Sequence, residues 1–337
     1  MKIWILYRDS AAHLRSEAHE VRRLVATAES RGHSVEVLAP EQFELVVTRD
    51  DRRSILVDGA PVELPDIVLP RMGAGTTYFA LAVIRQLERL RVPTINTAAA
   101  IETVKDKLFA HQLLAQHHLP IPKTMLAKFP IDVGLVARAL GFPVVVKTLS
   151  GSQGSGVFLC EDAGKFDDLM QLVRATQSNA NLIFQEFVAD SRGRDLRVFV
   201  VGGRVVAAME RRSAEGGFKA NYTQGGEVRA WTPDRDAELL ALESARVLGL
   251  EIAGIDLLFD GDGYKICEAN SAPGFEGLEA ATGQDIAGEI VDFLCFRMHG
   301  RTGKVPPQPL PAPPQPRPPT LMRGDGSEAV GAASPAV

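Results

Sequence analysis

The chain has 337 residues, of which 45% are hydrophobic and 23% charged, a composition typical of a folded globular protein with room for two domains. Its net charge of −5 gives no support for nucleic-acid binding through bulk electrostatics. No apolar run approaches the ~18 residues of a membrane-spanning helix, and the apolar start at residues 3–7 is too short for a secretory signal. The three cysteines, Cys160, Cys267 and Cys295, form no C-x-x-C pair and indicate buried thiols of a reducing compartment, so we expect a cytoplasmic protein.

Strands and helices alternate in the first hundred residues. The predicted strands cover residues 2–7, 34–38 and 66–70, and the predicted helices cover residues 16–31 and 78–90. The strands are short apolar runs, whereas the helices carry apolar positions at helical spacing. This alternation predicts a small α/β domain with a parallel sheet, which we place at residues 1–100.

The pattern changes after a predicted pair of connecting helices at residues 101–117. Strands are predicted at residues 143–148, 157–161, 182–188, 196–201 and 204–211, with helices near residues 165–175, 233–248 and 285–298. The fold class is therefore α/β plus α+β, with a second, two-lobed domain at residues 104–299.

Residues 300–337 differ in composition from both domains. Nine prolines lie between Val305 and Pro319, and Gly, Ser and Ala dominate beyond them. Such a segment cannot bury enough apolar surface to offset its ordering entropy, so we predict a disordered, polyproline-like tail. The tail is either a solvated appendage or a docking segment for a partner or for the chain's own site.

Two short apolar runs near residue 260 carry oxygen ligands. Asp256 lies in the first run, and Glu268 and Asn270 lie two positions apart in the second, so they project from one face of a strand. A hairpin through Gly261-Asp-Gly263 brings Asp256 alongside them. Two carboxylates and an amide oxygen, without His or Cys, suit a hard cation such as Mg²⁺ or Mn²⁺. Because such ions bridge phosphates, we expect the chain to bind ATP through its metals.

A glycine-rich segment follows a strand that ends in Lys147. Glycines at 151, 154 and 156 let the backbone approach phosphate oxygens, and Lys147 can reach the phosphates as a point charge. An ordinary hairpin turn would explain the glycines alone, but the lysine and the acidic trio favour a nucleotide site. The P-loop and dinucleotide fingerprints are absent. The order of glycine loop and lysine is also the reverse of that in protein kinases.

Other polar residues fall where a nucleotide site needs them. Gln185 and Glu186 interrupt an apolar strand whose departing backbone can bond an adenine edge, and Asp195 can hold ribose hydroxyls. Arg211 and Arg212 end another strand. Alone they would be surface charges, but beside a metal–nucleotide site they favour stabilisation of developing negative charge.

In this order the segments resemble the ATP-grasp superfamily, and most closely its RimK-like branch. The resemblance spans Met1 to about His299. It is carried by Leu69-Pro-Arg71-Met-Gly73, Lys105-Asp-Lys107-Leu, Val146-Lys147, Gln153-Gly-Ser-Gly156-Val, Gln185-Glu186, Asp195-Leu-Arg197, Glu210-Arg-Arg212, Gly254-Ile-Asp256 and Glu268-Ala-Asn-Ser-Ala-Pro-Gly274-Phe-Glu-Gly277. The common Glu-Val-Asn-Ala-Ser-Pro-Gly differs here at three positions that are not ligands, Ala269, Ser271 and Ala272.

The resemblance implies a role for each candidate residue. The phosphates would be contacted by Lys107, Lys147 and the loop residues Gly154, Ser155 and Gly156, and the triphosphate would be bordered by Lys219, Ala220 and Asn221. The adenine hinge would be formed by Gln185, Glu186, Phe187 and Val188, and the ribose would be bound by Asp195. Two Mg²⁺ or Mn²⁺ ions would be held by Asp256, Glu268 and Asn270, and the catalytic residue facing the reacting carbonyl would be Arg211.

The family's chemistry is ATP-dependent addition of L-glutamate to the C-terminus of small-subunit ribosomal protein six. The expected partners are therefore ATP, an amino acid such as L-glutamate, and a protein or peptide acceptor, without nucleic acid or membrane. The sequence leaves the oligomeric state open, a homo-oligomer included. Two alternatives stay open: a ligase of the same branch acting on a small molecule or an amino-carrier protein, and an ATP-grasp kinase or nucleotide-binding regulator.

Overall fold

The structure is a computed structural model of the chain. It describes residues 1–11, 18–49, 54–149, 156–176, 181–213, 217–218 and 226–302, without the side chains of the last three. The predictions for Gly154, Ser155, Lys219, Ala220, Asn221 and the Pro-rich tail lie outside the described residues.

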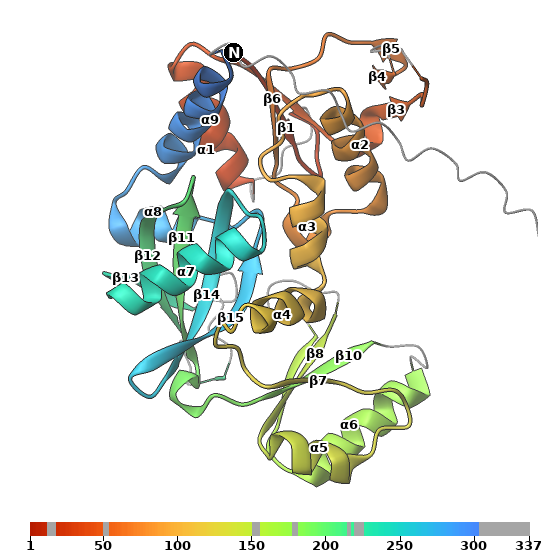
Figure 1. The fold of residues 1–337 in the computed structure, drawn as a ribbon, viewed down its shortest axis with the longest axis vertical. Coiled ribbons are helices and arrows are strands. Elements are labelled where there is room, and N and C mark those ends of the chain that lie inside the picture. The colour runs from red at the N-terminus through yellow and green to blue at the C-terminus, as the bar shows by residue number, and fades with distance from the viewer. Residues whose placement is uncertain are drawn as a thin grey trace, which may run out of the picture.

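The N-terminal part is the α/β unit that the sequence predicts (Figure 1). Its main elements are β1 (Lys2–Leu6), α1 (His19–Ser30), β2 (Ser34–Leu38), β6 (Ile67–Pro70) and α2 (Tyr78–Arg89). The three strands form a parallel sheet in the order β2-β1-β6, which confirms the parallel prediction. Chain order changes direction at β1, so the carboxyl ends of β1 and β6 meet at a switch point, where open α/β sheets bind ligands.

A second, small sheet in this part was not predicted. It consists of β3 (Phe43–Leu45), β4 (Ile55–Val57) and β5 (Ala60–Pro61), and short 3₁₀ turns, η2 (Pro40–Gln42) and η3 (Gly73–Gly75), flank the two sheets. Strands of two or three residues are too short to show an alternating pattern, which is why the sequence gives no signal for them.

Two helices, α3 (Ala98–Lys105) and α4 (Lys107–Gln116), lead into the second part and match the predicted helix pair. They are separated at Asp106, whose side chain accepts hydrogen bonds from the backbone N–H groups of Leu108 and Phe109. This aspartate N-cap starts α4 on a new axis and places Lys107 in its first turn.

The smaller lobe of the second part is a four-stranded antiparallel sheet covered by two helices. Its elements are β7 (Thr124–Leu126), α5 (Val133–Leu140), β8 (Val144–Thr148), β9 (Val157–Cys160), α6 (Ala163–Thr176) and β10 (Leu182–Glu186), with strand order β7-β10-β8-β9. Phe166 of α6 packs edge-on against Phe184 of β10, with ring centroids 5.1 Å apart. The lobe therefore has a core of its own, and its strand β8 ends near Lys147.

The larger lobe is a five-stranded antiparallel sheet in the order β13-β12-β11-β14-β15. Its elements are η4 (Ala189–Ser191), β11 (Arg194–Val201), β12 (Arg204–Arg212), β13 (Glu227–Ala230), α7 (Arg235–Val247), β14 (Ile252–Asp260), β15 (Gly263–Asn270), α8 (Glu276–Thr282) and α9 (Ile286–Thr302). Helix α7 lies across one face of the sheet (Figure 1).

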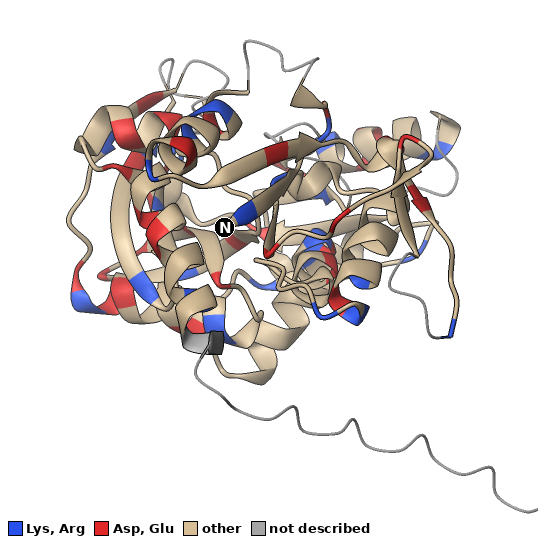
Figure 2. Cartoon of the chain, turned by 90° about the horizontal axis from the view of Figure 1, so that it is seen from above, with Lys and Arg blue, Asp and Glu red and all other residues tan. Residues whose placement is uncertain are grey.

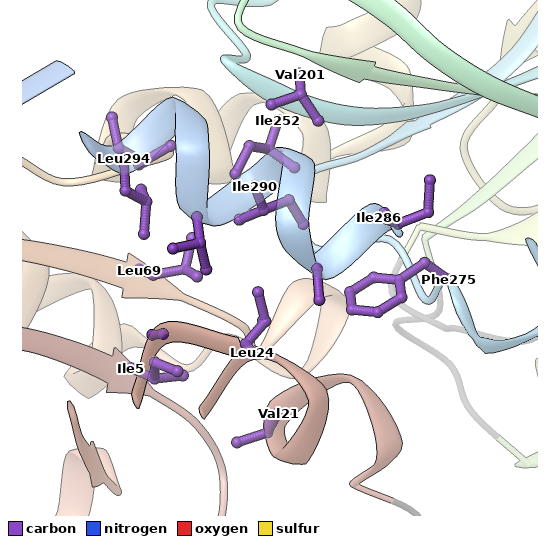
Figure 3. Close-up of a cluster of buried hydrophobic side chains, with 14 of the residues drawn as sticks. Ile5, Val21, Leu24, Leu69, Val201, Ile252, Phe275, Ile286, Ile290 and Leu294 are labelled. Atoms are coloured by element: carbon purple, nitrogen blue, oxygen red, sulfur yellow. The ribbon is translucent and has the colours of Figure 1, made fainter. Parts of the chain in front are cut away.

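One buried core joins the N-terminal part to the larger lobe. Figure 3 shows Ile5 and Leu69 of the parallel sheet facing Ile290 of α9, with Ile252 of the large sheet on the other side of the helix. Phe275, in the loop after β15, is fully buried in the same cluster. Burial of this many apolar side chains fixes the carboxyl end of β6 against the loop that follows β15.

Charged residues of both signs are interspersed along the helices and strands (Figure 2). Within the described ranges, every helix is too short or too polar to cross a membrane.

Candidate active site

The predicted hairpin brings the three predicted oxygen ligands together. Strands β14 and β15 pair antiparallel through the Gly261-Asp-Gly263 turn, with Asp256 opposite Glu268 and Gly254 opposite Asn270. Directly paired residues share a face, so all three side chains project from the same face of the sheet. The amide Nδ2 of Asn270 lies 3.4 Å from Oδ2 of Asp256. We call this surface the site face.

Two arginines on the neighbouring strands bind the acidic residues of the site face. Arg197 donates to both carboxylate oxygens of Asp256, each at 2.7 Å. Arg211 donates to both oxygens of Asp195, at 2.6 and 2.7 Å, and its Nη2 also lies 3.0 Å from Oδ2 of Asp256. The result is a continuous chain of bidentate ion pairs across β12, β11 and β14.

These ion pairs keep the carboxylate of Asp256 charged. Its side chain is 2% exposed, and burial alone would raise its pKa, but Arg197 and Arg211 lower the pKa to about 2. Burial lowers the pKa of Arg211, but Asp195 and Asp256 outweigh that effect and raise it. The ion pairs thus favour the charged forms of Asp256 and Arg211, whereas burial raises the pKa of Asp195 despite its ion pair with Arg211.

The chemistry of the donor set fits a divalent cation. Glu268 has no hydrogen-bond or ion-pair partner among the described residues, so its carboxylate is available as a ligand. Asp256 accepts from both arginines but keeps a lone pair, because an ionised carboxylate has about four acceptor sites. The described ranges hold no cluster of three His, Cys, Asp or Glu side chains, and the third predicted ligand is instead the amide of Asn270. Hard oxygen donors of this kind suit Mg²⁺ or Mn²⁺.

A β-bulge next to these ligands was not predicted. The register changes from Asp256 opposite Glu268 to Leu257 opposite Ile266, which leaves Cys267 without a cross-strand partner. Lys147 of the smaller lobe donates to Cys267 Sγ over 3.6 Å, so the bulge joins the two lobes at the site. Burial raises the pKa of the Cys267 thiol to about 11, which keeps it protonated. Cys267 and Cys295 are only partly buried, whereas we expected all three cysteines to be buried.

A neutral hydrogen-bond network lies beside the bulge. His111 of α4 contacts the Cys267 carbonyl through Nε2 and Thr124 Oγ1 through Nδ1, each at 3.0 Å. Gln185 donates through Nε2 to His111 Nδ1 at 3.1 Å and to Thr124 Oγ1 at 2.8 Å. Burial lowers the pKa of His111 to about 4, so the imidazole is neutral and Nε2 carries the proton that the carbonyl accepts. The sequence did not single out His111, which sits at an apolar position of a helix.

The predicted adenine hinge lies at the end of β10. The side chain of Gln185 is buried in the network described above, and Glu186 pairs with Lys265 of β15 at 2.7 Å. The strand ends at Glu186, two residues earlier than predicted, and the Val188 carbonyl accepts from the Ser191 N–H. These side chains link the two lobes. The hinge role concerns the backbone at Phe187 and Val188 and stays a prediction.

Strands β8 and β9 confirm that the glycine-rich segment joins two adjacent antiparallel strands, with Lys147 opposite Val157. Gly156 has φ +73°, and a Cβ there would lie 2.4 Å from Thr148 Oγ1, so the position requires glycine. Lys107 lies one helical turn before His111 on the same face of α4. The phosphate contacts of these residues stay predictions, as does the ribose contact of Asp195, whose two oxygens both accept from Arg211.

The comparisons with known proteins agree with this geometry. Residues 104–294 match the RimK-like ATP-grasp domain, and residues 1–101 match the RimK PreATP-grasp domain. The fold and site define an ATP-grasp ligase. Within that class, the chain belongs to the RimK-like ATP-grasp family, as the sequence motifs indicated.

Relatives and solved structures extend this similarity over most of the chain. Proteins named probable alpha-L-glutamate ligase from Aeromonas salmonicida and Thioalkalivibrio sulfidiphilus are each 38% identical over 295 residues, 87% of this chain and 96% and 95% of theirs. The ATP-grasp ligase PsnB, solved with a phosphomimetic variant of a minimal precursor, Mg and ADP, has a TM-score of 0.68 at 21% identity, covering 88% of this chain and 98% of PsnB. A RimK domain protein from Sphaerobacter thermophilus has a TM-score of 0.67 at 22% identity, covering 87% and 99%. At this identity the structures support the fold alone.

Proposed function

We propose that this ATP-grasp ligase adds L-glutamate to the C-terminal carboxylate of a protein or peptide, and that the acceptor is a protein such as small-subunit ribosomal protein six. ATP is consumed, and ADP and phosphate are released. Relatives named as alpha-L-glutamate ligases, 38% identical over nearly their whole length, support the choice of glutamate. The observation that carries the proposal is the convergence of Asp256, Glu268 and Asn270 with Arg211 on one face of the large sheet.

The proposed reaction has two steps. A carboxylate does not condense with an amine near neutral pH, because its oxygen is a poor leaving group. In the first step, an acceptor carboxylate oxygen bonds to the γ-phosphorus of ATP and the bond to the β–γ bridging oxygen breaks, which gives an acylphosphate and ADP. In the second step, the amine of glutamate attacks the acyl carbon, phosphate leaves with the C–O bond electrons, and the amine loses a proton.

The chain's own residues position and shield these groups. Lys147, anchored beside Cys267, and Lys107 in the first turn of α4 would hold the phosphates as point charges. Gln185 through Val188 would hold the adenine and Asp195 the ribose. The segment 151–156, of which only Gly156 is described, would cover the acylphosphate against water.

Arg211 is the proposed oxyanion donor. Its Nε and Nη2 are taken by Asp195 and Asp256, so Nη1 is the nitrogen that remains for the tetrahedral oxyanion. The two carboxylates fix the guanidinium before substrate binds, and this pre-organisation reduces the rearrangement needed during reaction. Two divalent ions, held by Asp256, Glu268 and Asn270, would neutralise phosphate charge when bound.

The function is tested by incubating the chain with ATP, Mg²⁺ and each amino acid in turn, together with a peptide that ends in a free carboxylate. A matched peptide with a C-terminal amide is the control, since it cannot form an acylphosphate at that end. We expect phosphate release only with glutamate and the free carboxylate, together with mass increases of whole glutamyl residues on the peptide.

Other outcomes identify the alternatives. Phosphate release with glutamate and a small acid, but with no protein or peptide, would replace the proposal with a small-molecule ligase. ADP formation that needs no amine at all would indicate a kinase or regulator of the same fold, and it would contradict ligation.

A further inference from the structure

The buried guanidinium of Arg71 lies at the junction between the N-terminal part and the larger lobe. Arg71 directly follows β6, and its backbone N–H donates to the carbonyl of Leu6 at the end of β1, at 2.8 Å. The residue therefore sits at the carboxyl-end switch point of the parallel sheet. Its side chain reaches across to the loop after β15, where Nη2 donates to the Pro273 carbonyl at 2.7 Å.

Two of the donor nitrogens of Arg71 are unused. The residue is 7% exposed, and Nε and Nη1 are shielded from solvent without a hydrogen-bond acceptor in the described part of the chain. No described carboxylate forms an ion pair with Arg71. Its guanidinium carbon lies 5.8 Å from the Phe275 ring centroid, but a buried cation without a hydrogen-bonded carboxylate is still costly, and unmet buried donors call for an explanation such as a bound group. By contrast, Arg197 and Arg211 each form a bidentate ion pair with a carboxylate of the site face.

The loop that Arg71 holds connects it to the reaction. Pro273 is three residues after Asn270, one of the predicted metal ligands. Glu20 of α1 accepts from the Phe275 N–H at 3.0 Å. The N-terminal part therefore holds this loop with two hydrogen bonds, one from Arg71 to the Pro273 carbonyl and one from the Phe275 N–H to Glu20. A Cβ at Gly274 would come within 2.9 Å of Glu20 Oε1, so a larger residue there would displace this carboxylate. Arg71 is thus hydrogen-bonded to the loop that leads out of the metal-ligand strand.

We propose that Arg71 is a substrate-binding residue whose unpaired Nη1 receives a carboxylate of the amino-acid substrate. Nη1 and the second hydrogen of Nη2 form the terminal edge of the guanidinium, and the two parallel N–H groups of that edge match the two oxygens of a carboxylate. The reacting acceptor carboxylate must instead meet ATP at the metal ligands. The amino acid that supplies the amine therefore has a non-reacting carboxylate that needs a cation of its own. This inference rests on the proposed function for the identification of the substrate as glutamate. It does not rest on that identification for the conclusion that the substrate is an amino acid with a non-reacting carboxylate.

The test is a kinetic comparison of Arg71→Met and Arg71→Lys with the wild type, at saturating ATP, Mg²⁺ and acceptor peptide. The variants should raise the KM for glutamate by about 10- to 100-fold, the value of one charged hydrogen-bonded contact, and leave the KM for ATP within about twofold. Lysine should rescue only in part, because it has no planar fork. Arg85→Met is the matched control: Arg85 lies in the same part of the chain but forms only an exposed ion pair with Glu102, so all kinetic constants should stay unchanged.

Substrate analogues identify the carboxylate. The α-amide and the side-chain amide of glutamate should each be compared with glutamate in the wild type and in Arg71→Met. In the wild type, replacing glutamate by one of the two amides should lower the activity as much as the Arg71→Met substitution lowers the activity with glutamate. In Arg71→Met, replacing glutamate by that same amide should cause no further loss. A rise in the KM of the acceptor peptide instead would assign Arg71 to the acceptor and overturn the proposal.

A purely structural role gives a different result. If Arg71→Met lowers the melting temperature and kcat while every KM and the analogue preference stay as in the wild type, Arg71 only clamps the Pro273 loop and the proposal is wrong. If the wild type turns over a different amino acid from glutamate, the proposed function fails, and the same comparison is made with that amino acid. A thermal-shift titration with the amino acid, ADP and Mg²⁺ measures binding without turnover.

Discussion

Arg211 and Arg212 are adjacent in the sequence but lie in two different electrostatic environments. Successive residues of a strand point to opposite faces, so Arg211 enters the site face, whereas Arg212 lies on the face that helix α7 covers. Arg211 is buried and bound by two carboxylates. Arg212 is half exposed and shares one carboxylate, that of the fully buried Glu210, with Arg229 and Arg194.

The difference explains why we propose Arg211, and not Arg212, as the catalytic arginine. On the site face, the carboxylates of Asp195 and Asp256 hold Arg211 in one geometry, so its charge is positioned before substrate arrives. On the α7 face, several partly exposed arginines compensate one buried acid, and Arg194 also stacks over Phe259 with its guanidinium carbon 4.3 Å from the ring centroid. That cluster satisfies a buried charge at the end of the sheet and has no unpaired acidic ligand near it, whereas Glu268 is unpaired among the described residues of the site face.

The largest effect is expected from Glu268 itself. Glu268→Gln keeps the size of the side chain but removes the charge that would hold the ions, and we expect Mg²⁺-dependent turnover to fall by about 10³-fold or more. Asn270→Asp, which adds charge at the neighbouring ligand, is the paired variant and should retain metal binding. ATP binding should be weak without metal in both wild type and Glu268→Gln, and Mg²⁺ should tighten it only in the wild type. Normal phosphate release by Glu268→Gln would remove Glu268 from the site.

The comparison of the two arginines is tested directly by Arg211→Lys and Arg212→Lys. Lysine cannot replace the bidentate fork between Asp195 and Asp256, so Arg211→Lys should lower kcat by ~10²-fold, the scale of losing one oxyanion donor. Arg212→Lys keeps a charge next to Glu210 and should change kcat by less than about threefold, as expected for a partly exposed pair. Equal losses in both variants would show that the two faces do not differ in function.

The sequence predicts those parts of the site that follow from periodic spacing and turns, but not those that depend on contacts between distant segments. The period-two spacing of Glu268 and Asn270 and the Gly-Asp-Gly turn were enough to predict the hairpin, because register follows from turn and alternation. The ion pair of Arg197 with Asp256 was not predicted, since it requires knowing that β11 lies beside β14. The bulge at Cys267 adds one residue without altering any periodic pattern. The unused donors of Arg71 become visible only when both parts of the chain are packed together.

His111 can be compared with the two arginines, because it is also a polar group in a buried environment but has no ion-pair partner among the described residues. Its pKa of about 4 lies below the ordinary 6.5 because of burial, assisted by Lys147 and Lys107, so the unfolded chain takes up the proton first as the pH falls. The ionisation of His111 therefore has no effect on the free energy of unfolding above pH 6.5. At pH 5 it lowers the free energy of unfolding by about 2 kcal/mol.

This loss is measured by urea unfolding of the wild type and His111→Gln at pH 7.5 and pH 5. Glutamine can still donate to the Cys267 carbonyl but does not titrate, so the stability of the variant should fall less between the two pH values, by about 2 kcal/mol. An equal fall in both proteins would show that His111 is accessible to protons in the folded state.

The smallest effect is expected from removing residues 305–337. Helix α9 contributes Ile286, Ile290 and Leu294 to the core beside the site face, and Met298 is the last residue with a described side chain that packs against this core. A truncation after residue 304 therefore spares the packed residues of the helix, and the removed segment has no periodic apolar face of its own. The melting temperature and the rate of ADP formation should both match the full chain. A large loss of stability would show that the tail packs on the fold, and a rise in activity would indicate that it occupies the acceptor site.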